Sequence, residues 1–139
     1  MEKLFEWIVN HDEISLLCCP SFLLHKQIKQ LGIDCQSINY DINFKDMPSI
    51  ICKDFVFDNV KLKSTVFHYN CEKTYPVGKM HQGIFILRGD DKYHNGDCNP
   101  ITSCEKLIED NNLTEVFDQY ISKSKNKKYN QYLVYGTNI

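Results

Sequence analysis

The chain has 139 residues, and its 42% hydrophobic and 24% charged residues are ordinary proportions for one globular domain, which we expect to span residues 1–139. The formal net charge of −2 argues against nucleic acid as a partner, because phosphate binding draws on accumulated positive charge. No run reaches the roughly 18–20 apolar residues that span a membrane. The N-terminus carries acids and lacks a small-residue cleavage site, so we expect no signal peptide and a cytoplasmic location.

The first third of the chain alternates helical and strand patterns. Residues 2–10 (EKLFEWIVN) place apolar side chains on one helical face. Residues 14–19 (ISLLCC) form a short, nearly continuous apolar run, which is typical of a strand covered on both sides. Residues 21–32 return to helical spacing and end at a glycine. Residues 35–40 (CQSINY) predict a second strand, which Asp41 follows directly.

The middle of the chain continues this alternation. Residues 50–57 hold a short strand-like patch around the run Phe55-Val56-Phe57. Residues 64–69 (STVFHY) are rich in β-branched and aromatic residues, and residues 83–88 (GIFILR) give the clearest strand signal. Residues 103–111 (SCEKLIEDN) predict a short helix with Ser103 as its N-cap.

The C-terminal part has a different pattern. Residues 113–121 and 129–135 flank a polar, basic tract at 122–128 (SKSKNKK), which favours an antiparallel hairpin at a sheet edge. The first of these segments also permits a helix. The basic tract is interpreted as a solvated loop, with contact to an anionic partner as the alternative.

Together these elements predict an α/β fold of three layers. Helices should cover an open, mostly parallel sheet that closes with an antiparallel C-terminal hairpin. Right-handed crossovers would put the first and fourth strands in the middle of the sheet. The carboxyl ends of those strands would then be the place for a ligand.

The sequence contains seven cysteines, an odd number, and no CxxC pair. We interpret them as reduced and mostly buried thiols. A zinc site is disfavoured because paired ligand spacing is missing, so no metal is predicted. A catalytic thiol at Cys71 is the remaining alternative and would need a neighbouring base.

The run HYNCEKTYP at residues 68–76, followed by ILRGDDKYHNGDCNPITSCEKLIEDNNLTEVFDQY at 86–120 and YNQYLVYG at 129–136, resembles class I methyltransferases. These are Rossmann-like domains that bind S-adenosylmethionine, and their seventh strand runs antiparallel beside the fifth. The similarity is to small methyltransferase-like proteins of tailed bacteriophages and bacteria, in which a strand ends in Asn-Thr-Ser-Cys-Glu-His-Met. The match covers about residues 12–136.

The resemblance implies a role for particular residues of this chain. The turn after the first strand, where the family has a glycine-rich cofactor loop, is formed here by Cys18, Cys19, Pro20 and Ser21. Further residues are implied to bind the ribose and adenine of the cofactor or to face its reactive end and the substrate. They are Asp41 for the ribose, Asp54 and Phe55 near the adenine, Asn70, Cys71 and Glu72 at the reactive end, and Arg88 through Tyr93 on the substrate side.

The chain departs from the family pattern at the cofactor loop. No glycine stands between residues 1 and 31, and Pro20 removes a backbone donor. This departure predicts weakened binding of the cofactor. It leaves two hypotheses open: a methyltransferase of unknown acceptor, or a non-catalytic protein that keeps the fold and binds a protein partner or a nucleotide.

Several of these residues also have simpler structural interpretations. Asp41 can cap a turn and Asp54 can be a surface acid. His68 is expected to be a buried histidine with a hydrogen-bond partner. His81 and His94 lie in predicted loops, where either is also a candidate general base.

Overall fold

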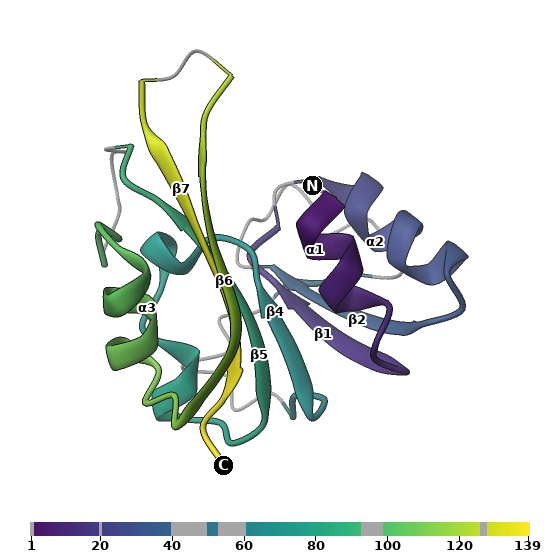
Figure 1. Cartoon of the computed structure of the whole chain (residues 1–139). Helices are drawn as coiled ribbons and strands as arrows, with labels where there is room; N and C mark the ends of the chain where they lie inside the picture. Colours follow the sequence, from purple (N-terminus) through teal and green to yellow (C-terminus); the bar gives the residue numbers. More distant parts are fainter. Residues whose placement is uncertain (1, 20, 40–49, 53–60, 93–98, 126–127) are drawn as a thin grey trace.

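The structure is a computed structural model that describes residues 2–19, 21–39, 50–52, 61–92, 99–125 and 128–139. Three α-helices and seven strands lie in these ranges, with two short 3₁₀ turns, η2 and η3, between the fourth and fifth strands (Figure 1). The helices are α1 (Glu2–Ile8), α2 (Phe22–Gln30) and α3 (Cys104–Asp110). The strands and turns are β1 (Glu13–Leu17), β2 (Asp34–Asn39), β3 (Ile50–Cys52), β4 (Thr65–His68), η2 (Cys71–Lys73), η3 (Val77–Lys79), β5 (Ile84–Asp90), β6 (Glu115–Lys123) and β7 (Asn130–Thr137).

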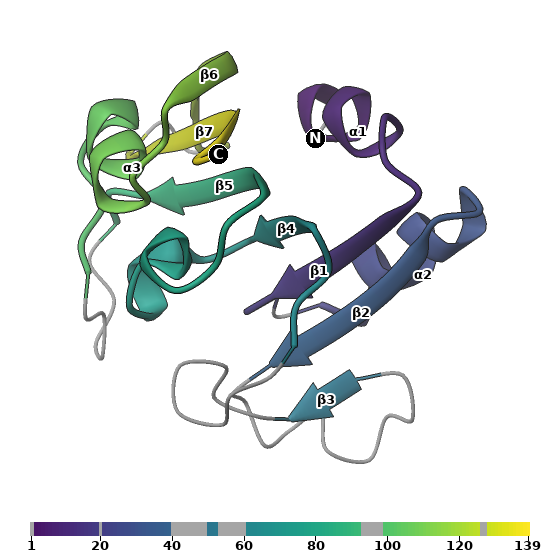
Figure 2. The ribbon, with the colours of Figure 1, turned by 90° about the horizontal axis from the view of Figure 1, so that it is seen from below.

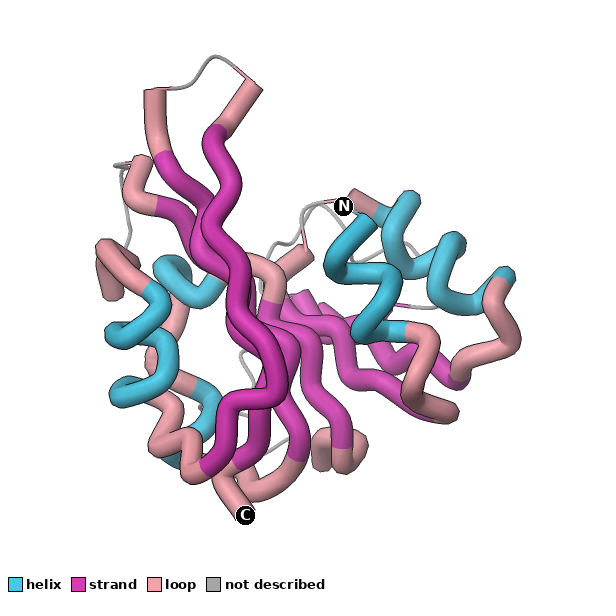
Figure 3. The backbone as a smooth tube through the Cα atoms, viewed as in Figure 1, coloured by secondary structure: helices cyan, strands magenta, loops and turns pink. Residues whose placement is uncertain are grey.

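All seven strands belong to one sheet in the order β3-β2-β1-β4-β5-β7-β6 (Figure 3). Strands β1 to β5 run parallel to one another, whereas β7 runs antiparallel to both β5 and β6. The first and fourth strands lie side by side in the middle of the sheet, which confirms their expected central position. The predicted three-layer α/β fold with a C-terminal hairpin is also confirmed.

The sheet is covered on both faces, which explains why β1 and β4 read as apolar runs (Figure 2). Helices α1 and α2 pack on one face, in a core that includes Trp7, Ile28 and Phe67. Helix α3 packs on the other face, in a core that includes Phe85 and Leu107. Each face therefore has its own apolar core, with the sheet between them.

Local sequence signals set the helix starts. The Ser21 hydroxyl accepts a hydrogen bond from the Leu23 amide and caps α2. The Ser103 hydroxyl accepts from the Lys106 amide and caps α3, as predicted. Residues 115–123 form a strand, so the helical alternative for this segment is wrong. The antiparallel pairing of this segment with β7 stabilises it as a strand.

Strand β3 covers only residues 50–52, at the start of the predicted segment 50–57. The aromatic run at 55–57 lies outside the described residues. Within the described part of the chain, no helix is long and apolar enough to cross a membrane.

Candidate functional site

The strand register brings the carboxyl ends of β1, β2, β4 and β5 to one edge of the sheet, here called the carboxyl edge. Leu17, the last residue of β1, pairs with Ile38 in β2 and with His68 in β4. His68 in turn pairs with Leu87 in β5. The residues that follow these positions therefore lie at neighbouring points of the same edge.

The turn after β1 has an unusual backbone. Cys18 has a φ of 57°, in the left-handed region that glycine adopts without steric cost. Its side chain belongs to the core on the α3 face, whereas Cys19 belongs to the core on the α1–α2 face. The turn thus has a left-handed residue without a glycine, and its two thiols point away from each other into the cores.

Two asparagine side chains hold this turn in place. Asn39, the last residue of β2, donates from Nδ2 to the Cys19 carbonyl over 2.5 Å. Asn70, two residues beyond β4, donates from Nδ2 to the Cys18 carbonyl over 2.7 Å. The turn is therefore tied to the strands on both sides of β1.

Arg88 of β5 joins the same network. Its Nη1 donates to the Tyr69 carbonyl over 3.2 Å and to the Asn70 Oδ1 over 3.3 Å. The guanidinium lies over the Tyr69 ring, with 4.3 Å between its central carbon and the ring centroid. Asn70 consequently connects the β1 turn to β5, which is a positioning role that its amide group can fill.

The structure brings together some of the predicted site residues and leaves others untested. Cys19, Ser21 and Asn70 lie at the carboxyl edge, and Cys71 and Glu72 follow in the η2 turn. Several predicted residues lie outside the described residues, namely Pro20, Asp41, Asp54, Phe55 and Tyr93. Their assignment stays a prediction.

Cys71 and Glu72 are buried, with 3% and 1% of their surface exposed. Burial raises the pKa of the Cys71 thiol well above its ordinary value, with Glu72 adding to the shift. The thiol donates to the His68 carbonyl and packs in the core on the α3 face. A protonated, packed thiol does not support Cys71 as a nucleophile.

His68 is fully buried, and its Nε2 lies 3.1 Å from the Thr74 hydroxyl oxygen. Burial lowers the pKa of His68 to about 3, so the imidazole is neutral at physiological pH. This confirms the interpretation of His68 as a buried histidine with a partner. His81 packs edge-on against Phe85, and His94 lies outside the described residues.

A cleft of about 580 Å³ opens beside the carboxyl edge. It lies between α1, the ends of β4 and β5, and the β6–β7 hairpin, which extends past the end of the sheet (Figure 1). Tyr69 and Arg88 line it from the sheet, and Tyr120 and Lys123 line it from the hairpin. The family resemblance already implied that Arg88 lies on the substrate side. That β6 also lines the cleft could not be predicted without knowing how the strands pair.

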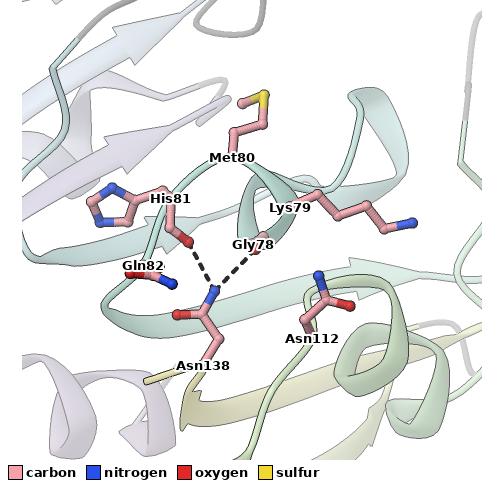
Figure 4. Close-up of a pocket in the computed structure, with 7 residues that line it drawn as sticks. All are labelled: Gly78, Lys79, Met80, His81, Gln82, Asn112 and Asn138. Carbon is pink, nitrogen blue, oxygen red and sulfur yellow. Dashed lines mark hydrogen bonds between the residues drawn. The ribbon is translucent and has the colours of Figure 1, made fainter.

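A second pocket, of about 560 Å³, lies at the opposite edge of the sheet (Figure 4). There the Asn138 side chain donates to the Gly78 and His81 carbonyls and accepts from the Gly83 amide. These bonds fix the connection between η3 and β5, which is a structural role. No cluster of residues suited to a metal ion occurs in the part of the chain that the structure describes.

Comparison with known proteins supports the fold assignment. No protein-family profile and no curated protein matches the chain by sequence. Among solved structures, 1,6-didemethyltoxoflavin-N1-methyltransferase of Burkholderia thailandensis, with 1,6-didemethyltoxoflavin and S-adenosylhomocysteine bound, is similar at a TM-score of 0.66. The two share 9% sequence identity, and the match covers 97% of this chain and 76% of that one.

Coclaurine N-methyltransferase, bound to N-methylheliamine and S-adenosylhomocysteine, is similar at a TM-score of 0.53 and 9% identity. That match covers 80% of this chain but only 46% of the coclaurine enzyme. Both neighbours are methyltransferases, and both similarities are to the fold rather than to the sequence. The chain therefore has the fold of class I methyltransferases.

Proposed function

We propose that the chain is an S-adenosylmethionine-dependent methyltransferase that binds its cofactor at the carboxyl edge. The observation that carries the proposal is the left-handed turn at Cys18, aligned with the ends of β2 and β4 and held by Asn39 and Asn70. Ligands of open α/β sheets bind at such an edge. The two structural neighbours, each solved with S-adenosylhomocysteine, support the choice of cofactor.

The described residues of the turn fit such a cofactor. A glycine-rich loop serves because its backbone adopts a left-handed conformation and passes close to the ligand. Here Cys18 adopts that conformation, and both thiols belong to the cores, so neither projects over the edge. The missing glycines therefore do not by themselves exclude the cofactor.

The bound cofactor would supply a methyl group on a positively charged sulfur. The chain would contribute position rather than acid–base chemistry, since transfer needs the acceptor held in line with the methyl group. Asn70 would hold the β1 turn against β4 and β5 through its two hydrogen bonds. Asp41, which directly follows the predicted strand at residues 35–40, remains the proposed ligand of the ribose hydroxyls.

The run at residues 68–76 and the order of the later segments support a relation to the small phage-encoded members of this group, and with it a location in the host cytoplasm. We specify the methyl acceptor only as a nucleophile that fits beside the carboxyl edge.

Calorimetry with S-adenosylhomocysteine tests the proposed function. We expect heat of binding, and at least about tenfold weaker binding by Asp41→Ala, the loss expected for hydrogen bonds to a charged group. Asp34→Ala is the matched control, because Asp34 is exposed and begins β2 at the opposite edge of the sheet.

Equal affinity of the two variants would contradict the role of Asp41. Absence of binding to the wild-type chain would contradict the proposed function as a whole. The second hypothesis, a binding protein that keeps the fold without the cofactor, would then take its place.

A further inference from the structure

Arg88 is a buried cation with unused hydrogen-bonding capacity. Only 9% of its surface is exposed. Its Nη1 donates to two neutral oxygens, those of the Tyr69 backbone and the Asn70 side chain. The N–H groups on Nη2 and Nε make no hydrogen bond within the described residues, although a guanidinium offers five donors in a fixed fork.

Arg88 also lacks a charged partner in the described part of the chain. None of the ion pairs among the described residues includes it. Burying a cation without an anion is costly, so buried charges are normally paired. A guanidinium kept in this state is suited to bind an oxyanion of a ligand through two parallel hydrogen bonds.

The cleft beside Arg88 has the matching charge. Four basic side chains and two acidic ones line it, and Lys123 and Lys125 come from the end of the hairpin. Lys3 is paired with Glu6 and Asp118, so it is already compensated. The hairpin lysines form no ion pair within the described residues and would add long-range attraction for an anion.

The walls of the cleft are aromatic as well as basic. The Arg88 guanidinium lies over the Tyr69 ring, while Tyr120 is 47% exposed on the hairpin side. A volume of about 580 Å³ is within the range of small-ligand sites. These features favour a small, flat ligand over a macromolecule.

We propose that this cleft binds a carboxylate or phosphate group of a small ligand, with Arg88 as its bidentate partner. The inference rests on the proposed function, because it takes the cofactor to occupy the carboxyl edge beside the cleft. The oxyanion has two sources that share this chemistry: the methyl acceptor, or the amino-acid end of the cofactor, since Arg88 lies close to the β1 turn through Asn70.

Nuclear magnetic resonance titration of the full chain with benzoate and with inorganic phosphate tests the inference. We expect shifts at the amides of Tyr69 and Arg88, and no such shifts with benzamide, which has the same ring without the charge. Arg88→Gln should weaken binding about tenfold or more, as expected for a charge-assisted pair. Lys63→Gln, a surface lysine at the opposite end of β1, should bind as the wild type does.

Arg88→Lys provides a second variant, because it keeps the charge and removes the fork. It should fold and bind the anions more weakly than the wild type. Equal binding by wild type, Arg88→Lys and Arg88→Gln, or shifts confined to other parts of the chain, would overturn the inference. Failure of benzoate and phosphate to shift any residue of the wild type would overturn it as well.

A comparison of S-adenosylhomocysteine with 5′-methylthioadenosine identifies the source of the oxyanion, because the second lacks the amino-acid end. If Arg88→Gln weakens only the first, the oxyanion is that of the cofactor. If neither changes while benzoate binding falls, the oxyanion is that of the acceptor. Benzoate binding that depends on Arg88, in a chain that binds neither adenosine compound, would support the cleft and contradict the methyltransferase function.

Discussion

Cys18 shows at the level of one residue how the chain builds its turn without glycine. A left-handed conformation costs a residue with a Cβ about 1–2 kcal/mol. Cys18→Gly removes this cost and Cys18→Ala keeps it, while both lose the buried thiol. We therefore expect the glycine variant to be more stable than the alanine variant by about 1 kcal/mol in urea unfolding.

The neighbouring residue is the control for this prediction. Cys19 is also buried but has no positive φ. There the order should reverse, with Cys19→Gly less stable than Cys19→Ala by about 0.5–1 kcal/mol, because glycine loses more chain entropy on folding. The same order at both positions would refute the left-handed turn.

His68 should make stability depend on pH. Its pKa is about 3 in the folded state against an ordinary value of 6.5, because it is buried. The unfolded chain therefore binds the extra proton between these values, and stability falls as pH drops from 6.5 toward 3 by up to about 1.4 kcal/mol per pH unit. His68→Gln should flatten this part of the profile of unfolding free energy against pH. A variant with the slope of the wild type would show that His68 does not carry the effect.

Single residues were the hardest features to predict from the sequence. The strand-end position of Asn70 was evident from the apolar run before it. Its two partners, Cys18 and Arg88, are 52 and 18 residues away, and only the sheet order brings them together. The burial of Cys71 was equally hard to predict, because the sequence around a cysteine that follows a strand does not indicate whether its thiol is buried or exposed.

At the level of elements, one side chain holds the link between η3 and β5. Asn138 follows β7 and makes three hydrogen bonds to the backbone of this connection, and Figure 4 draws those to the Gly78 and His81 carbonyls. Asn138→Ala should destabilise the fold by about 2–3 kcal/mol, at about 1 kcal/mol for each bond. Urea unfolding measures this change.

Gln82 is the matched control, because it lines the same pocket and is exposed. Gln82→Ala should change stability by less than about 0.5 kcal/mol. Similar losses for both variants would mean that the pocket, rather than the three bonds of Asn138, accounts for the effect.

Most elements followed from local signals, and the exceptions have physical reasons. The helices at 2–10 and 103–111 and the strands at 64–69 and 83–88 carry clear periodicity or β-branched composition. The segment 113–121 left two interpretations open because its edge strand is exposed, with Phe117, Tyr120 and Ile121 about half accessible. An exposed edge has no alternation of buried and polar residues to distinguish it from a helix.

For the whole molecule, the alternation of helices and strands was sufficient to predict the layers and the central pair of strands. It was not sufficient to predict the cleft, whose walls come from α1, from β4 and β5, and from the hairpin. The residues that line this cleft come from segments as far apart in the sequence as Glu2 and Leu133, and composition does not record such contacts. The fold was thus predictable to a large extent, and the candidate site only at its carboxyl edge.

The proposed cofactor site lies at the carboxyl edge of β1, β2 and β4. A crystal structure of the chain with S-adenosylhomocysteine would show whether the ligand binds there. We predict ligand density against the turn at residues 18–21, with the amino-acid end toward Asn70 and the ribose toward Asp41. A structure of the saturated crystal with this edge empty, or with the ligand bound elsewhere, would contradict the assignment of this edge as the cofactor site.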